Sequence, residues 1–187
     1  MRYVVSLVML ATACASIPPA ASAAPEWKLL NATAGTPELQ IRSTTQIRRA
    51  TVTDAGARGP DFDVKRVPGK LQGVTYVDRP VDMQQRGNGI AGRVAGDSWD
   101  LTLEPDGSEM RATGLIGGQP STFWMSPQKI RGSIGPCQFE LVWSADNYAG
   151  ARSCGPMSDV VQLQLPAALA SWSNPEVAAL LAIFVQR

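Results

Sequence analysis

Along most of the chain, apolar and polar positions alternate in short runs, and Gly, Pro, Asp or Asn interrupts them about every 8 to 12 residues. Within residues 38–52, for example, Leu39 and Ile41 would face one side of a strand, and Gln40 and Arg42 the other. Further strand-like runs span residues 61–67, 71–77 and 160–165, and a turn-rich stretch spans residues 54–60. This pattern predicts a mainly all-β fold, an antiparallel meander closed as a small barrel or stacked as a sandwich.

A loose repeat of glycine-containing segments reinforces the prediction of a meander. Gly92, Gly114, Gly132 and Gly150 recur at spacings of 22, 18 and 18 residues, which suit two strands and two turns per repeat. Glycine permits bulges and positive φ, so we expect these positions to bend strands where a small sheet must curl.

The most specific prediction is a disulfide-bonded hairpin. The midpoint between Cys137 and Cys154 falls between Ala145 and Asp146, where a turn is expected. A hairpin turning there places four pairs on one face of the ribbon: Trp143 with Tyr148, Leu141 with Gly150, Phe139 with Arg152, and Cys137 with Cys154. Closing this loop would contribute about 3 kcal/mol to stability.

The C-terminal residues change from strand to helix periodicity. Ser173, Pro175 and Glu176 are a cap residue, a first-turn proline and an early acid, and they predict a helix over residues 175–186. We expect this helix to pack against the sheet or to plug a barrel mouth. Its low polarity leaves an alternative, in which it docks onto a membrane or a partner.

The N-terminus predicts export. Arg2 precedes an apolar stretch too short to span a bilayer, and Ala21-Ser22-Ala23 has the form of a signal-peptidase site. We therefore expect a signal peptide at residues 1–23, a flexible segment at 24–37 and a single β-rich domain at 38–187. The protein would be periplasmic or secreted, with no integral membrane span in the mature chain. Residues 10–14 loosely resemble a lipobox, which would make Cys14 a lipid anchor.

Charge adds little to the choice of partner. The full chain has 17 Lys and Arg against 16 Asp and Glu, and Arg2 is the one charged residue of the leader, so the mature chain is formally neutral. This balance gives no electrostatic reason to expect nucleic acid as a partner.

The chain contains no histidine, which excludes Ser-His-Asp and Cys-His catalysis and histidine-built zinc sites. Paired carboxylates remain, at Asp61 with Asp63, Asp97 with Asp100, Glu104 with Asp106 and Glu140 with Asp146. None of these pairs has a supporting motif, so we assign no catalytic, metal-binding or cofactor-binding residue and expect no cofactor.

Three residues are candidates for a binding surface: Trp124, Arg152 and Tyr148. Neighbouring strand residues point to opposite faces, so either Phe123 or Trp124 must lie away from the core. Arg152 would stand beside the disulfide, although a salt-bridged structural arginine is the alternative. Trp99 and Trp143 stand at positions of their predicted strands that would face inward, which favours packing in the core.

These observations favour a non-enzymatic binding module of the cell envelope that contacts an envelope or secreted protein, for example as an inhibitor or immunity-type protein. Three alternatives remain: an envelope assembly or structural factor, a carboxylate-based hydrolase, and a small outer-membrane β-barrel.

Overall fold

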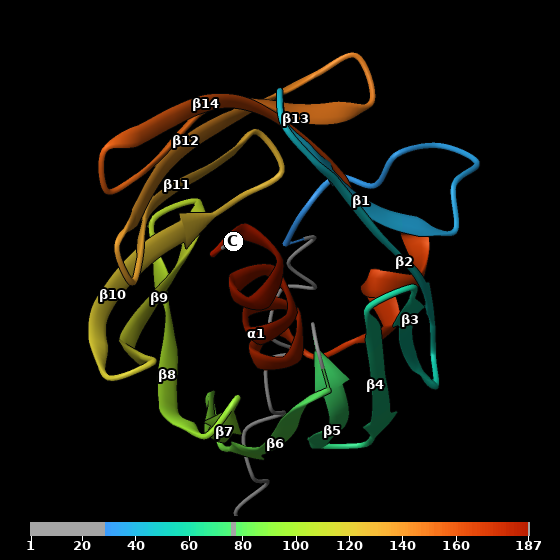
Figure 1. Ribbon diagram of the computed structural model, residues 1–187, viewed down its shortest axis with the longest axis vertical. Helices are drawn as coiled ribbons and strands as arrows, with labels where there is room; N and C mark the ends of the chain where they lie inside the picture. Colours follow the sequence, from blue (N-terminus) through green and yellow to red (C-terminus); the bar gives the residue numbers. More distant parts are fainter. Residues whose placement is uncertain (1–28, 76–77, 187) are drawn as a thin grey trace, which may run out of the picture.

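The computed structural model describes residues 29–75 and 78–186, which form a closed antiparallel β-barrel around one helix (Figure 1). The strands are β1 (Glu38–Arg42), β2 (Ile47–Thr53), β3 (Gly56–Gly59), β4 (Phe62–Val67), β5 (Lys70–Thr75), β6 (Arg79–Arg86), β7 (Gly89–Val94), β8 (Asp97–Asp106), β9 (Glu109–Ile116), β10 (Gln119–Met125), β11 (Lys129–Ile134), β12 (Cys137–Ser144), β13 (Asn147–Cys154) and β14 (Met157–Gln164). Each strand pairs with the next, and β14 pairs with β1 to close the ring. The predicted meander is confirmed, and its form is a barrel.

Alternation along the strands separates an apolar interior from a polar outer wall. On β8, Trp99, Leu101 and Leu103 are buried, while the residues between them are exposed. Because strand side chains point to opposite faces in turn, this pattern fixes which residues face the lumen. Leu39 and Ile41 of β1 are likewise buried.

The predicted disulfide hairpin is present with the predicted register. β12 and β13 pair Trp143 with Tyr148, Leu141 with Gly150, Phe139 with Arg152 and Cys137 with Cys154. The two sulfur atoms are 2.02 Å apart and the two Cα atoms 4.0 Å apart. All the large side chains of these pairs lie on the lumen side of the ribbon.

The repeated glycines Gly92, Gly114, Gly132 and Gly150 occupy lumen-facing positions on alternate strands, and Gly73 on β5 extends the series. Gly114 illustrates the reason: it pairs with Leu101, and a Cβ atom there would lie 1.8 Å from the carbonyl oxygen of Asp100. Its φ of 152° is also one that other residues rarely adopt. Glycine thus allows neighbouring strands to approach closely and leaves space in the lumen.

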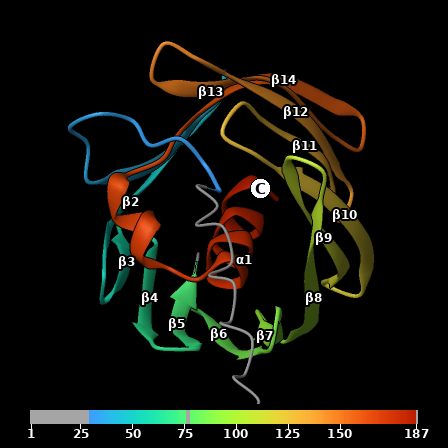
Figure 2. The ribbon, with the colours of Figure 1, turned by 180° about the vertical axis from the view of Figure 1, so that it is seen from behind.

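Helix α1 (Asn174–Val185) fills that space, close to the predicted residues 175–186. Figures 1 and 2 show the ring of strands surrounding it. Pro175 is buried, and every residue from Glu176 to Val185 is at most 4% exposed. The low polarity of the helix follows, because apolar walls surround all its sides. The alternative role as a docking element is wrong, since the helix has no free face.

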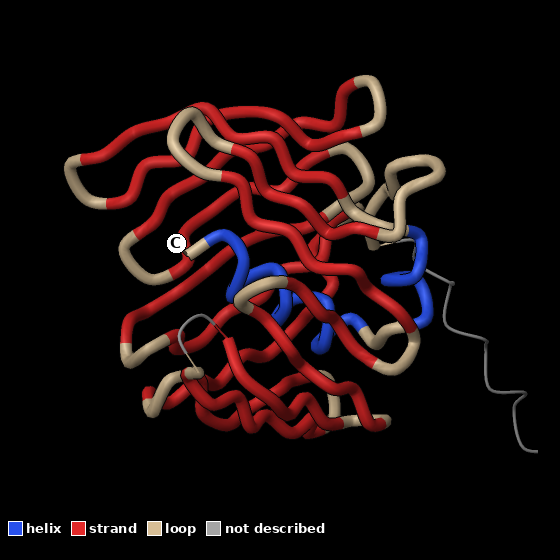
Figure 3. Tube along the Cα trace, turned by 45° about the vertical axis from the view of Figure 1, so that its right-hand side comes forward, coloured by secondary structure: helices blue, strands red, loops and turns tan. Residues whose placement is uncertain are grey.

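The 3₁₀ helix η1 (Ala167–Ser171) joins β14 to α1 at the rim of the barrel, and α1 then enters the interior (Figure 3). The Glu176 carboxylate accepts a hydrogen bond of 2.8 Å from the backbone N–H of Ser173, the predicted cap residue. The residue at which α1 begins is therefore determined by neighbouring residues in the sequence.

Two expectations require correction. The turn-rich stretch at residues 54–60 contains the short strand β3, which pairs with β2 and β4. The described part of the expected flexible segment, residues 29–37, is docked on the barrel: the backbone N–H groups of Asn31 and Thr33 donate to the Tyr148 hydroxyl and the Leu165 carbonyl, at 2.9 and 2.7 Å. The leader and Cys14 lie outside the described residues.

Candidate binding surface

One cross-strand row on the outer wall combines an aromatic ring, paired charges and apolar side chains. From β8 to β14, the strand registers align Glu104, Arg111, Trp124, Arg131, Glu140, Ala151 and Val160 in that order. Directly opposed residues on adjacent strands are close enough to interact, so this row is a continuous strip.

Trp124 is held in a fixed orientation within the strip. Its indole N–H donates to the Asp106 carboxylate at 2.9 Å, and the Arg131 guanidinium lies 4.5 Å from the ring centroid. Arg131 in turn donates to Glu109 at 2.6 Å, and this hydrogen bond raises the pKa of the guanidinium. The ring is partly exposed, and partners on two other strands, β8 and β11, restrain it.

A second row runs beside the first and carries neutral polar groups. It consists of Thr102, Thr113, Thr122, Ser133, Gln138, Ser153 and Ser158. Residues of both rows line one open groove, among them Trp124, Arg131, Gln138 and Ser153. These hydroxyl and amide groups can donate or accept hydrogen bonds without adding charge.

The β14 end of the strip is apolar. Val160 is 64% exposed and Val142 is 49% exposed. Their cross-strand partners on β13 are Ala151 and Ala149, which are two residues apart on the same face. These four small side chains form an exposed apolar patch next to the charged part of the strip.

The structure places the three predicted surface residues differently. Trp124 lies on the outer wall while Phe123 is completely buried, as strand alternation predicted. The placement of Arg152 and Tyr148 on a surface is wrong, because both face the lumen and are almost fully buried. The predicted hairpin already contained the signal, since it put both residues on the same face as Cys137 and Leu141.

Arg152 and Tyr148 instead hold other segments to the barrel. Arg152 forms two hydrogen bonds with the Asp159 carboxylate, at 3.2 and 2.9 Å, and donates to the Val185 carbonyl at the end of α1. The Tyr148 hydroxyl accepts from Asn31 and donates to the Ser126 carbonyl. Burial raises the pKa of Tyr148 to about 12.

No family model, curated protein or solved structure matches this chain.

In three of the four candidate carboxylate pairs, at least one member forms an ion pair with a basic side chain. Glu104 pairs with Arg111 at 2.9 Å, and Asp63 pairs with Arg58 at 2.8 Å. The hydrogen bond from Lys129 lowers the pKa of Glu140, whereas a general acid requires a raised pKa.

In residues 29–75 and 78–186, no three metal-ligating side chains of His, Cys, Asp or Glu come together. No helix within the same described ranges is long and apolar enough to cross a membrane.

Proposed function

We propose that this protein is an exported, non-enzymatic binding module of the cell envelope that recognises another protein through its outer wall. The surface is the strip and apolar patch described above, centred on Trp124 and extending to Val160, and is called here the Trp124 face. The observation that carries the proposal is the restrained, partly exposed Trp124 ring between charged and apolar neighbours.

The composition of the Trp124 face fits a protein partner. Tryptophan and arginine are enriched among residues that dominate binding energy, and a restrained side chain loses little conformational entropy on binding. The row crosses seven strands spaced about 4.8 Å apart, which gives a strip about 30 Å long. This length is compatible with an interface of about 800 Å² per partner.

Its charges also limit the type of partner. Arg111, Arg131 and Lys129 each form an ion pair with a carboxylate on the same wall. A strongly charged polymer would have to compete with these pairs, whereas a neutral protein surface could leave them intact. This supports protein recognition over nucleic-acid binding.

The direction of alternation supports a barrel surrounded by water. Outer-membrane barrels place apolar residues on the outside along nearly every strand. Here the apolar residues face α1, and charged side chains such as Glu104 and Arg131 face outward. The binding module is therefore preferred to the outer-membrane barrel, and the export signal predicted at residues 1–23 supports an extracytoplasmic partner.

Site-specific crosslinking tests this proposal. A photoreactive amino acid at Ala151, in the Trp124 face, is compared with one at Thr51, which is exposed on β2, in cells that export the protein. The proposal predicts a discrete protein adduct from position 151 and none from position 51. Absence of an adduct at 151, or the same adducts at both positions, would contradict it.

The captured protein is then purified and its affinity measured directly. Trp124→Ala should weaken binding at least about tenfold, which corresponds to about 1.4 kcal/mol. Arg93→Ala, an exposed change on β7 outside the Trp124 face, should leave the affinity within about twofold. Equal effects of the two variants would remove Trp124 from the interface.

A further inference from the structure

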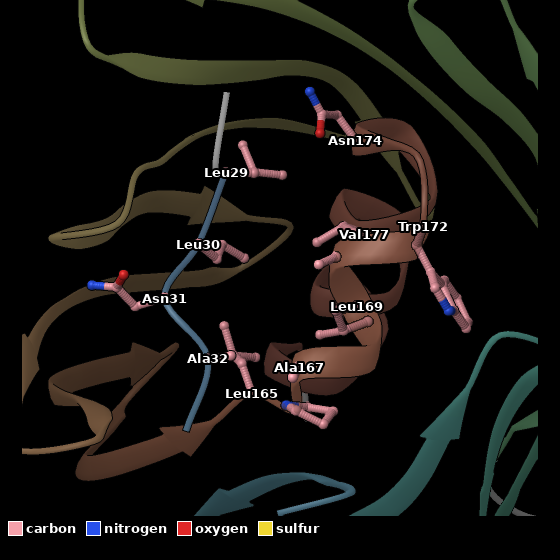
Figure 4. Close-up of a pocket in the computed structure, with 12 residues that line it drawn as sticks. Leu29, Leu30, Asn31, Ala32, Leu165, Ala167, Leu169, Trp172, Asn174 and Val177 are labelled. Atoms are coloured by element: carbon pink, nitrogen blue, oxygen red, sulfur yellow. The ribbon is translucent and has the colours of Figure 1, made fainter. Parts of the chain in front are cut away.

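A cavity of about 430 Å³ lies at the rim of the barrel, away from the Trp124 face. One wall is the N-terminal segment, residues 29–32, and the other is the chain from Leu165 through η1 to the first turns of α1. Figure 4 shows Leu30 and Ala32 facing Val177 and Leu169 across this space, while the Trp172 ring points away from it. Two segments that are distant in the sequence thus enclose this cavity.

The lining of the cavity is apolar and uncharged. Its side chains include five large aliphatic ones, and the polar members are the amides of two asparagines. The large aliphatic residues are Leu29, Leu30, Leu165, Leu169 and Val177, and the asparagines are Asn31 and Asn174. Small-molecule sites typically have this size, a mainly apolar lining and a few polar groups that fix orientation.

Hydrogen bonds hold the N-terminal wall in place. The Asn31 side chain donates to the Pro127 carbonyl at 2.7 Å, and its backbone N–H donates to the Tyr148 hydroxyl at 2.9 Å. Thr33 is bonded through its backbone N–H to the Leu165 carbonyl, directly beside the cavity. The wall is therefore formed before any ligand binds, which reduces the entropic cost of binding.

The uncharged lining also favours a neutral ligand over an ionised one. An ionised carboxylate or phosphate buried here would lose hydration without gaining a cationic partner among the lining residues. A neutral apolar molecule would gain from burial against the aliphatic side chains.

We propose that this cavity is a binding site for one neutral, apolar small molecule, such as an uncharged single-chain lipid or an aromatic compound. The site is independent of the Trp124 face and does not depend on the proposed protein partner.

The test is a fluorescence titration of the purified mature protein with N-phenyl-1-naphthylamine, an uncharged apolar dye. The proposal predicts one saturable site. Ala32→Trp, which fills the cavity, should weaken dye binding at least about tenfold. Ala34→Trp is the matched control, because Ala34 is exposed on the same segment and does not line the cavity.

Ala167→Trp is a second filling variant at an exposed lining position, and circular dichroism verifies that each variant is folded. Decanol, which is neutral, should displace the dye, and decanoate at the same concentration should displace it much less. Equal displacement by the anion would overturn the assignment of a neutral ligand.

Three further results would overturn the proposal. The first is the absence of saturable binding, and the second is unchanged binding in both filling variants. The third concerns Trp27, which precedes the cavity wall by two residues in the sequence. Saturable binding by Trp27→Ala but not by the wild type would assign the space to this side chain of the protein itself. Trp124→Ala should leave dye binding unchanged, and loss of binding in that variant would place the dye on the outer wall.

Discussion

At the scale of single residues, buried charges mark both ends of the helix inside the barrel. Glu176 is fully buried at the N-terminal end of α1, where it pairs with Arg66 at 2.9 Å. Arg152 lies at the other end and donates to the Val185 carbonyl. A carboxylate at the N-terminus and a guanidinium at the C-terminus both complement the helix dipole. These residues therefore fix the position of α1 along the lumen.

Replacing Arg152 tests this role. Arg152→Met leaves the Asp159 carboxylate without its ion-pair partner and removes a donor from the Val185 carbonyl. We expect the free energy of unfolding in urea to fall by about 3 kcal/mol. Arg111→Met removes an ion pair on the outer wall, where both side chains are partly exposed, and should cost less than about 1 kcal/mol. Equal losses would contradict the structural role of Arg152.

Tyr148 predicts a dependence of stability on alkaline pH. Its pKa is raised from 10.0 to about 12 in the folded protein, chiefly by burial, so the unfolded chain loses the proton first. The contribution is fully present below pH 10 and is lost as the pH rises toward 12, by up to about 1.4 kcal/mol per pH unit.

The measurement compares urea unfolding of the wild type and Tyr148→Phe between pH 9, which is below both pKa values, and pH 11, which lies between them. The stability difference between the two proteins should shrink as the pH rises. A difference that stays constant over this range would show that Tyr148 ionises equally in both states.

At the scale of elements, the predictable parts were those specified by nearby residues. The hairpin of β12 and β13 follows from alternation on both sides of a central turn, and α1 follows from its cap residues. β3 was missed because a strand of four residues with two glycines resembles a turn. Its strand conformation depends on pairing with β2 and β4.

Local sequence patterns predict only part of the two candidate sites. Alternation required either Phe123 or Trp124 to lie outside. The contacts of Trp124 with Asp106 and Arg131 depend on strand pairing, which the local sequence pattern does not specify. The rim cavity was not predicted, because its two walls are segments more than a hundred residues apart that meet only in the folded barrel.

A matched pair of leucine substitutions tests the assignment of α1 to the core. Leu180 on α1 is fully buried, whereas Leu115 on β9 faces outward and is 45% exposed. Leu180→Ala should lower the free energy of unfolding by about 2 to 5 kcal/mol, and Leu115→Ala by less than about 1 kcal/mol. Similar values for the two variants would show that α1 does not fill the core.

At the scale of the whole molecule, closure of the barrel separates two surfaces with different chemistry. Apolar side chains from the strands pack on α1, so the outer wall is left to polar groups and the Trp124 face. The pairing of β1 with β14 that completes this arrangement joins strands more than a hundred residues apart. The sequence pattern could not distinguish a barrel from a sandwich, because it does not reveal that β1 pairs with β14.

The central claim is that α1 lies inside a closed barrel, and the contact between Phe62 of β4 and Phe184 of α1 tests it most directly. The two ring centroids are 5.2 Å apart, although the residues are far apart in the sequence. A nuclear Overhauser experiment on the mature protein with labelled phenylalanine rings should show strong cross-peaks between them, and Phe184→Leu should remove these peaks. Absence of the cross-peaks in the folded wild-type protein would contradict the claim.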